Sequence, residues 1–313
     1  MRHIDRILVA VKDPYAGRLP GVAKAAQLAR ALHAELTLFR AVPAPHSGAE
    51  PNMQLDALEL IAQRLRRRAI RVSVSVQSHQ PADEAILREA ARIDADLIVA
   101  EAHPRGHHGA AFLHLTDWEL LRRSPVPVLL VKRTEPYRRP NVLVALDPDH
   151  TFDKPARLDA EILGVGSTVT NALQGTLHAV HAYAPVPASV LAHGTPSATA
   201  LVEVQRLSAA TAADKLARAV RTADIPPAHR YVIGRHVPDA IEEVAAQCRS
   251  TIVVMGAVAR SGLKRLLIGN TVERVLDQLS CDILVVKAPQ LAQRVPSDPA
   301  VLRLLSQPVV AAG

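Results

Sequence analysis

The chain has 313 residues, of which 49% are hydrophobic and only 3% are aromatic, and its formal net charge is +7. This length predicts about two domains, whose cores must be built mainly from Ala, Val, Leu and Ile. Two cysteines exclude a disulfide framework, and the sequence contains no apolar run near the ~20 residues that a membrane helix needs.

The positive charge is spread along the chain, and its densest run is Arg64, Arg66, Arg67 and Arg68. Aromatic residues that could stack on bases are not interleaved with this run, so we expect solvated helix faces and no nucleic-acid partner. The first residues, MRHIDRILVAV, lead directly into a strand pattern without the apolar region of a signal peptide. We therefore expect a cytoplasmic protein without a membrane anchor.

Strand and helix patterns alternate along the first half of the chain. Short apolar runs predict strands at 6–11, 35–42, 70–76, 96–100 and 126–131. Apolar residues at helical spacing predict helices at 20–32, 55–65, 81–93 and 118–123. This alternation predicts a doubly wound α/β sheet whose parallel strands are buried on both faces.

A polar segment with two prolines, 134–140, separates this half from a second series of the same kind. The second series predicts strands at 142–147, 177–183, 230–233, 251–255 and 282–286. Its helices are predicted at 158–173, 198–223, 239–248 and 270–279. We therefore expect an N-terminal domain at 1–133, a linker at 134–140, a C-terminal domain at 141–288 and a tail at 289–313.

The two halves are copies of one domain. The segment TDWELLRRSPVPVLLVK at Thr116–Lys132 aligns without a gap with TVERVLDQLSCDILVVK at Thr271–Lys287, a shift of 155 residues (287 − 132). The same shift places Glu101 opposite Gly256. Gly164-Val165-Gly166 looks like part of a dinucleotide-binding loop, but a helical pattern precedes it where that motif requires a strand, so we predict helix there.

Because of this repeat, the chain resembles the tandem E type of the universal stress protein family. The resemblance extends from Ile7 to Lys287. In the first copy the resemblance rests on Thr116-Asp117-Trp118, Leu120-Leu121-Arg122, Pro125 and Pro127, and in the second on Gly256, Arg260, Gly262 and Gly269-Asn270-Thr271. It implies an adenine nucleotide alpha hydrolase-like fold, with two five-stranded parallel sheets of order 3-2-1-4-5 that pair through their last strands. Many members of the family bind ATP through G-x2-G-x9-G-(S/T), and others do not.

In that strand order, ligands lodge in the crevice at the carboxyl ends of the first and fourth strands. In the second copy Asp147 and Gly256 end those strands. The resemblance implies that Asp147 contacts a nucleoside, that Gly256 and Gly269 let the backbone approach phosphates, and that Asn270 and Thr271 donate hydrogen bonds. Positive charge in the same loop comes from Arg260, Lys264 and Arg265.

The second copy departs from the motif at two positions. Its second glycine falls on Ala259, and its final Ser/Thr falls on Asn270, with Thr271 one place later. If position 259 needs a left-handed backbone, alanine costs about 1–2 kcal/mol, so we expect weaker binding than in motif-perfect relatives. The residues leave two interpretations open: a site for ATP or a related adenine nucleotide, and a loop kept for packing and turn geometry.

The first copy departs further, because Glu101, Pro104 and His114 stand at the three glycine positions. A carboxylate would face any phosphate, so we expect no phosphate binding there. The same loop contains His103, His107, His108 and His114, and imidazoles beside a carboxylate suit zinc. Their spacing is not that of a tight metal site, so we assign no metal. We expect Trp118 to be a packing residue.

The sequence predicts no catalysis, because it lacks a Walker lysine, a serine elbow and paired carboxylates at strand ends. We expect a non-enzymatic stress-response protein; the alternatives are a weak ATP hydrolase and a carrier of another small or apolar ligand. The closing strands, 126–131 and 282–286, would each leave an exposed edge if their domain stood alone. We expect them to pair within the chain as a pseudo-dimer, and a further homodimer stays open.

Overall fold

The computed structural model describes residues 3–42, 50–78, 81–102, 116–149, 158–183, 197–257 and 270–287. The strands of the first half are β1 (Arg6–Ala10), β2 (Glu35–Val42), β3 (Val72–Ser78), β4 (Leu97–Glu101) and β5 (Val128–Val131). Those of the second half are β6 (Asn141–Leu146), β7 (Thr176–Ala182), β8 (Arg230–Ile233), β9 (Ile252–Gly256) and β10 (Asp282–Val286).

All of these strands join one sheet in the order β3-β2-β1-β4-β5-β10-β9-β6-β7-β8. Within each half the neighbours are parallel, and each half has the order 3-2-1-4-5 that the resemblance implies. The halves meet at the middle, where β5 and β10 pair antiparallel with Leu129 opposite Leu284. The two closing strands therefore hide each other's edges, and β3 and β8 end the described sheet.

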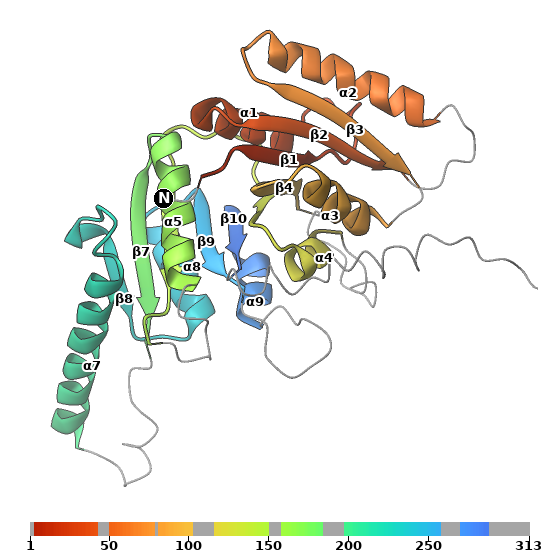
Figure 1. The fold of residues 1–313 in the computed structure, drawn as a ribbon. Helices are drawn as coiled ribbons and strands as arrows, with labels where there is room; N and C mark the ends of the chain where they lie inside the picture. The colour runs from red at the N-terminus through yellow and green to blue at the C-terminus, as the bar shows by residue number, and fades with distance from the viewer. Residues whose placement is uncertain are drawn as a thin grey trace, which may run out of the picture.

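Helices cover both faces of the sheet (Figure 1). The first half contributes α1 (Pro20–Leu32), α2 (Glu50–Arg66), α3 (Ala82–Arg92) and α4 (Thr116–Arg123). The second half contributes α5 (Leu158–Ala172), α7 (Ala198–Ala219), α8 (Val237–Gln247) and α9 (Asn270–Gln278), with a short 3-10 turn at Pro227–His229. The predicted order of elements is confirmed; α2 begins earlier than the predicted 55, and α7 ends before the predicted 223.

Two hydrophobic cores lie on opposite faces, and each runs through both halves. One core joins apolar residues of α1, α2, α5 and α7 to the sheet, and the other joins those of α3, α4, α8 and α9. Strand residues such as Ile7, Val99, Val142 and Val254 are fully buried. Because parallel strands are covered on both faces, their sequences are continuous apolar runs rather than alternating ones.

The Gly164-Val165-Gly166 segment lies inside α5, as predicted, and its two glycines have different surroundings. A Cβ added to Gly166 would lie 2.5 Å from Cγ1 of Val144, so Gly166 lets α5 lie close to β6. A Cβ added to Gly164 would meet no heavy atom within 4 Å among the described residues. Gly166 is therefore a packing glycine, whereas Gly164 faces open space.

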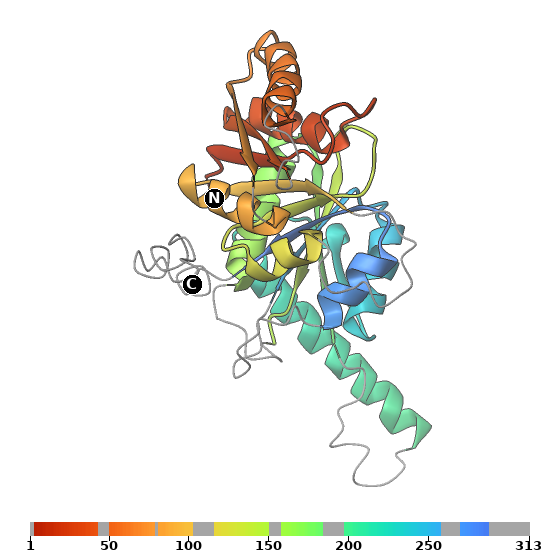
Figure 2. The ribbon, with the colours of Figure 1, turned by 90° about the vertical axis from the view of Figure 1, so that its right-hand side faces the viewer.

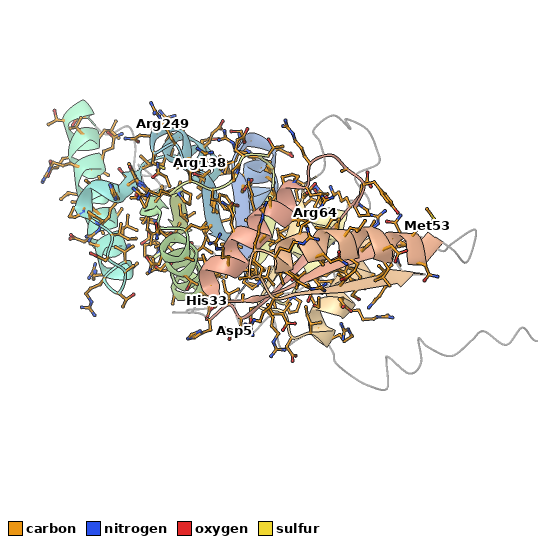
Figure 3. All side chains as sticks on the ribbon, turned by 90° about the horizontal axis from the view of Figure 1, so that it is seen from above. Asp5, His33, Met53, Arg64, Arg138 and Arg249 are labelled. Atoms are coloured by element: carbon orange, nitrogen blue, oxygen red, sulfur yellow. The ribbon has the colours of Figure 1, made fainter. Side chains whose placement is uncertain are left out.

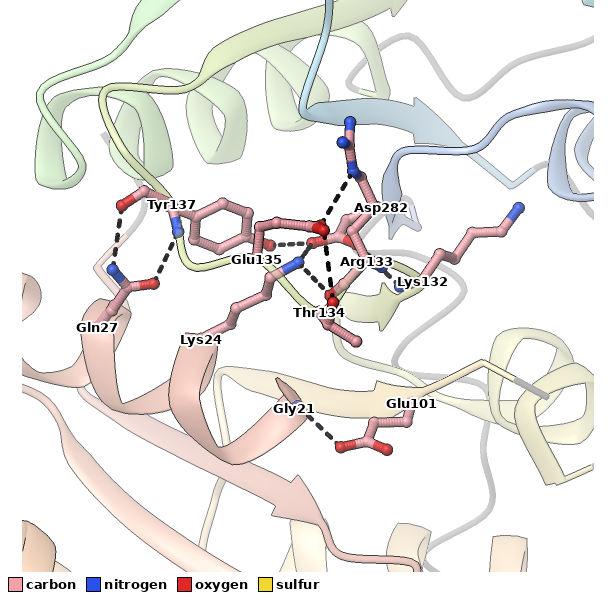
Figure 4. A network of polar contacts seen from close by, with 10 residues as sticks. All are labelled: Gly21, Lys24, Gln27, Glu101, Lys132, Arg133, Thr134, Glu135, Tyr137 and Asp282. Atoms are coloured by element: carbon pink, nitrogen blue, oxygen red, sulfur yellow. Dashed lines mark hydrogen bonds and ion pairs between the residues drawn. The ribbon is translucent and has the colours of Figure 1, made fainter. Parts of the chain in front are cut away.

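A buried ion pair lies where the two halves meet (Figure 4). Lys24 of α1 donates from Nζ to Oδ2 of Asp282, at the start of β10, at 2.5 Å, and the two side chains are 1% and 0% exposed. The Tyr137 hydroxyl donates to the same oxygen at 2.6 Å. Oδ1 of Asp282 accepts the backbone N–H groups of Lys132 and Arg133 at 2.8 and 3.0 Å. One carboxylate thus connects the first helix, the linker and the last strand.

The linker is fixed by further polar contacts around this ion pair. Gln27 exchanges two hydrogen bonds with the backbone of Tyr137, at 3.0 and 3.1 Å. Lys24 also donates to the Arg133 carbonyl at 2.7 Å, and its ammonium lies 4.8 Å from the centre of the Tyr137 ring. Burial, followed by the charge of Asp282, raises the pKa of Tyr137 well above its ordinary value. The tyrosine is therefore a neutral donor.

Two lysines at equivalent positions reach across the junction in both directions. Lys132, after β5, donates to the carbonyls of Leu276 and Leu279 at the end of α9. Lys287, after β10, donates to the Arg122 carbonyl in the last turn of α4 at 2.7 Å. A cation at a helix C-terminus satisfies carbonyls that lack helical partners. Burial lowers the pKa of Lys287 to about 8.

Arginine side chains are distributed over the surface rather than gathered on one face. Figure 3 shows Arg64 well away from Arg138 and Arg249. Exposed arginines commonly pair with neighbouring acids, as Arg206 pairs with Glu203 on α7 at 2.7 Å. Figure 2 shows that α7 extends beyond the rest of the described structure. This distribution agrees with the expected solvated helix faces.

Removing one partner of the buried pair should destabilise the whole chain. We expect Lys24→Met and Asp282→Asn each to lower the free energy of unfolding by about 3–5 kcal/mol, because each leaves a buried group without its charged partner. The double variant should lose less than the sum of the two, because the residues interact directly. Urea unfolding followed by circular dichroism measures these changes.

The matched control is Arg206→Met, which breaks an exposed pair on α7 and should leave the unfolding midpoint unchanged. If the Lys24 and Asp282 variants unfold at the same urea concentration as this control, the buried pair does not hold the halves together.

Candidate functional site

Each half of the sheet has one point where the winding direction changes. In the first half it lies between β1 and β4, and in the second between β6 and β9, which pair in parallel. Ligands of doubly wound folds bind at the carboxyl ends of such strands. We call these places the first and the second switch point, and the residues at those strand ends decide what each can bind.

At the first switch point, Glu101 ends β4 and points at the start of α1. Its Oε1 accepts the backbone N–H of Gly21 at 2.8 Å, as Figure 4 shows. Leu19, which precedes the helix, has no side-chain acceptor, so the carboxylate provides a partner for an N-terminal N–H group. A Cβ at position 21 would lie 3.0 Å from Cγ of Glu101, so Gly21 permits this approach.

Other charges surround Glu101. Lys12 follows β1, and its burial lowers its pKa, while the charges of Asp117 and Glu101 act in the opposite direction. Asp117 is a buried residue in the first turn of α4. The helix terminus and the lysine thus already have carboxylates of the chain itself close by. An added phosphate would have to displace Glu101 and would meet its repulsion.

The remaining predictions for the first copy have different outcomes. Trp118 is partly buried and packs against the core cluster of α3, α4, α8 and α9, so its predicted packing role agrees with the structure. His103, His107, His108 and His114 lie outside the described residues. Within the described ranges, no group of three His, Cys, Asp or Glu side chains has the arrangement of a metal site.

At the second switch point, Asp147 follows β6 directly. Its backbone N–H donates to both carboxylate oxygens of Asp159 at 3.2 and 3.3 Å. Asp159 lies in the first turn of α5, where a carboxylate is favourable for the helix dipole. The predicted nucleoside contact, Asp147, therefore belongs to a small acidic group at this strand end.

Gly256 ends β9 next to the first turn of α5. A Cβ placed on it would lie 2.7 Å from Cδ2 of Leu158 and 3.1 Å from Cδ1 of Ile162. The space that Glu101 uses in the first half is thus taken here by apolar side chains of α5. Gly256 is required for this packing, which favours the packing interpretation for this glycine.

The loop that should approach phosphates lies between β9 and α9. Ala259, Arg260 and Gly269 fall outside the described residues, and Asn270 and Thr271 are described only as the first residues of α9. Their predicted contacts with a nucleotide therefore stay predictions. The start of α9 agrees with the predicted helix start, within the residue or two by which helix ends vary.

A polar cluster near the second switch point was missed by sequence reasoning. Asp149, two residues after Asp147, pairs through one oxygen with Lys215 of α7 and through the other with Nε2 of His181 on β7, the latter at 3.3 Å. His181 is 1% exposed. The signal in the sequence was a pair of histidines, His178 and His181, within a mainly apolar strand, and the lysine lies 66 residues from Asp149.

Comparison with known proteins identifies the family. The sequence model of the universal stress protein family matches residues 3–132 and 139–287. The chain belongs to the universal stress protein family and carries two of its domains in tandem.

No described helix is long and apolar enough to cross a membrane.

Curated relatives are similar over about two thirds of their length. Universal stress protein E of Salmonella typhi is 30% identical over 226 residues, which are 69% of this chain and 68% of that protein. The universal stress protein E homolog of Haemophilus influenzae is 28% identical over 205 residues, which are 65% of this chain and 66% of that protein.

Solved structures share the fold along the whole chain. A putative universal stress protein of Pseudomonas aeruginosa UCBPP-PA14 has a TM-score of 0.71 and 26% identity, and the match covers 97% of this chain and 98% of that one. A functionally unknown protein of Pseudomonas aeruginosa PAO1 has a TM-score of 0.74 and 24% identity, with 93% and 95% covered. The second of these supports the fold alone.

Removing the carboxylate at the first switch point should weaken α1. We expect Glu101→Ala to lower the free energy of unfolding by about 0.5–2 kcal/mol, the usual effect of losing a helix cap. Millimolar phosphate should then raise the melting temperature of the variant more than that of wild type, because the N–H of Gly21 becomes available. Thermal unfolding with and without phosphate measures both effects.

The control is Glu242→Ala, which removes the same charge from the exposed side of α8. It should neither lower the free energy of unfolding by this amount nor increase the response of the melting temperature to phosphate. Equal phosphate responses in Glu101→Ala and Glu242→Ala would mean that Glu101 does not exclude anions from the first switch point.

Proposed function

We propose that this protein is a non-enzymatic tandem universal stress protein of the cytoplasm, which acts in the stress response and binds ATP or a related adenine nucleotide in its C-terminal domain. The N-terminal domain has a structural role. It completes the sheet and shields the β10 edge of the nucleotide-binding half, so that one chain forms its own pseudo-dimer.

One difference between the halves carries this proposal. At the position where the first half places Glu101 against a helix N-terminus, the second half has Gly256, which brings no carboxylate. The loop that follows Gly256 contains Arg260, Lys264 and Arg265, and it leads into the N-terminus of α9. Positive charge and a helix N-terminus favour a phosphate chain, whereas the first switch point repels one.

The packing at Gly256 limits where the ligand can lie. Because Leu158 and Ile162 fill the space beside this glycine, phosphates must bind toward α9 rather than toward α5. The nucleoside would then lie near Asp147, whose backbone is already fixed by Asp159. This supports a site in which one end is acidic and recognises hydroxyl or amino groups, while the other end is basic.

The experiment is equilibrium titration of the full chain with ATP. Wild type should bind, and Gly269→Glu should bind at least about tenfold more weakly, because a new carboxylate would lie beside the phosphates. Gly269→Ala separates this repulsion from a backbone effect, and Glu242→Ala on the exposed side of α8 should leave the affinity for ATP unchanged. Phosphate release from ATP should stay at the rate of buffer alone.

If wild type and Gly269→Glu both ignore millimolar ATP, nucleotide binding is excluded and the carrier of another ligand becomes the better account. Phosphate release well above the buffer rate, lost in Gly269→Glu, would contradict the non-enzymatic role and favour a slow hydrolase.

A further inference from the structure

A large groove lies in the second half, between α5 and α7, and the nucleotide proposal does not use most of it. Its volume is about 1280 Å³, above the ~300–1,000 Å³ of common small-molecule sites. It extends along α5 from Asp159 to Asn171, about 18 Å at 1.5 Å per helical residue. The groove therefore has room for a ligand of more than one ring.

The sequence of α5 keeps this groove open. Ala160, Gly164, Ser167 and Asn171 recur at spacings of three and four residues, so they share one face of the helix, and all four line the groove. Gly164 lies in the middle of this row, where an added Cβ would meet no heavy atom of the described chain within 4 Å. Small side chains thus leave the wall of the groove unfilled.

The opposite wall is formed by the C-terminal part of α7 and the residues that follow it. The buried side chains of Ala212, Leu216 and Val220 anchor this wall, while Lys215 and Thr222 line the groove. Lys215 reaches across to Asp149, whose other oxygen faces the buried His181. Burial raises the pKa of Asp149, but Lys215 and His181 outweigh this and hold the pKa below its ordinary value. The carboxylate is therefore a fixed, already paired anion.

The other charges in the lining are also close to balance. Asp159 accepts the N–H of Asp147, and Arg218 donates to the carbonyl of Asp214 on its own helix. Asp224, which also lines the groove, is exposed. The lining holds three carboxylates, one lysine, one arginine and His229, so the groove selects strongly for neither anions nor cations.

Uncharged hydrogen-bonding groups make up much of the remaining lining. Ser167, Asn171, Thr176 and Thr222 each offer donors and acceptors, and the apolar side chains of Leu163 and Leu177 lie among them. Hydroxyl and amide groups beside apolar carbon match a molecule that presents hydroxyls at its edges and C–H groups on its faces.

We propose that this groove binds a neutral, polyhydroxylated small molecule, that is, a sugar or a similar polyol. Ser167, Asn171 and Thr222 bind its hydroxyls, and Leu163 and Leu177 contact its C–H faces. Ser167, Asn171 and Thr222 are not among the residues assigned to the nucleotide, so we expect the sugar to bind whether or not a nucleotide is bound.

The test titrates the full chain with maltose, followed by calorimetry and by saturation-transfer NMR on the sugar. Gly164→Gln places a polar side chain in the groove and should weaken maltose binding at least about tenfold, whereas Gly164→Ala should stay within about threefold of wild type. Glutamine also forms helix better than glycine, so the variant folds. Asn171→Leu removes hydrogen bonds without filling the groove and should weaken binding as well.

ATP affinity should be the same in wild type and Gly164→Gln, which keeps this test distinct from that of the phosphate loop. Three results would overturn the proposal. The first is no saturation transfer to maltose in wild type, and the second is equal maltose affinity in wild type and Gly164→Gln. The third is that wild type binds citrate or spermidine but not maltose, and that Gly164→Gln abolishes this binding. The last result would assign the groove to a charged ligand.

Discussion

The antiparallel contact of β5 with β10, closed by the Lys24–Asp282 ion pair, is the constraint on which the rest of the structure depends. Neither strand can stand at a free edge without exposing an apolar row, and neither charge can stay buried without the other. The contact is approximately twofold symmetric: Lys132 and Lys287 each donate to a carbonyl at the C-terminus of a helix in the other half. Asp282 breaks this symmetry, because the equivalent residue in the first half is Pro127.

The pairing of β5 with β10 involves neither switch point, so the residues at the two switch points can differ. Because stability comes from a sheet and two cores shared by both halves, a change at one strand end does not threaten the fold. The first switch point has Glu101, which binds the helix terminus that an anion would use. The second has Gly256, and the start of α5 packs against it. One duplicated domain thus presents two different chemical environments.

The fold could be predicted from the sequence because its signals repeat. Apolar runs mark the strands, and a constant shift of 155 residues aligns Glu101 with Gly256. The strand registers agree with this shift, because Glu101 lies beside Val131 and Gly256 beside Val286. The site was less predictable, because its contacts join residues that no local pattern connects. Lys24 and Asp282 are 258 residues apart, and Lys215 and Asp149 are 66 apart. Likewise, a glycine at a strand end does not reveal whether a phosphate or a leucine lies next to it.

Hydrogen–deuterium exchange of the intact chain tests the central claim most directly. If β5 and β10 form the middle of a single sheet, the amides of 128–131 and 283–286 should exchange as slowly as those of the interior strands β1 and β6. The outer strands β3 and β8 should exchange faster, since one side of each has no neighbouring strand in the described sheet. Exchange of β5 and β10 as fast as that of β3 and β8, in a chain that is still folded, would contradict the account.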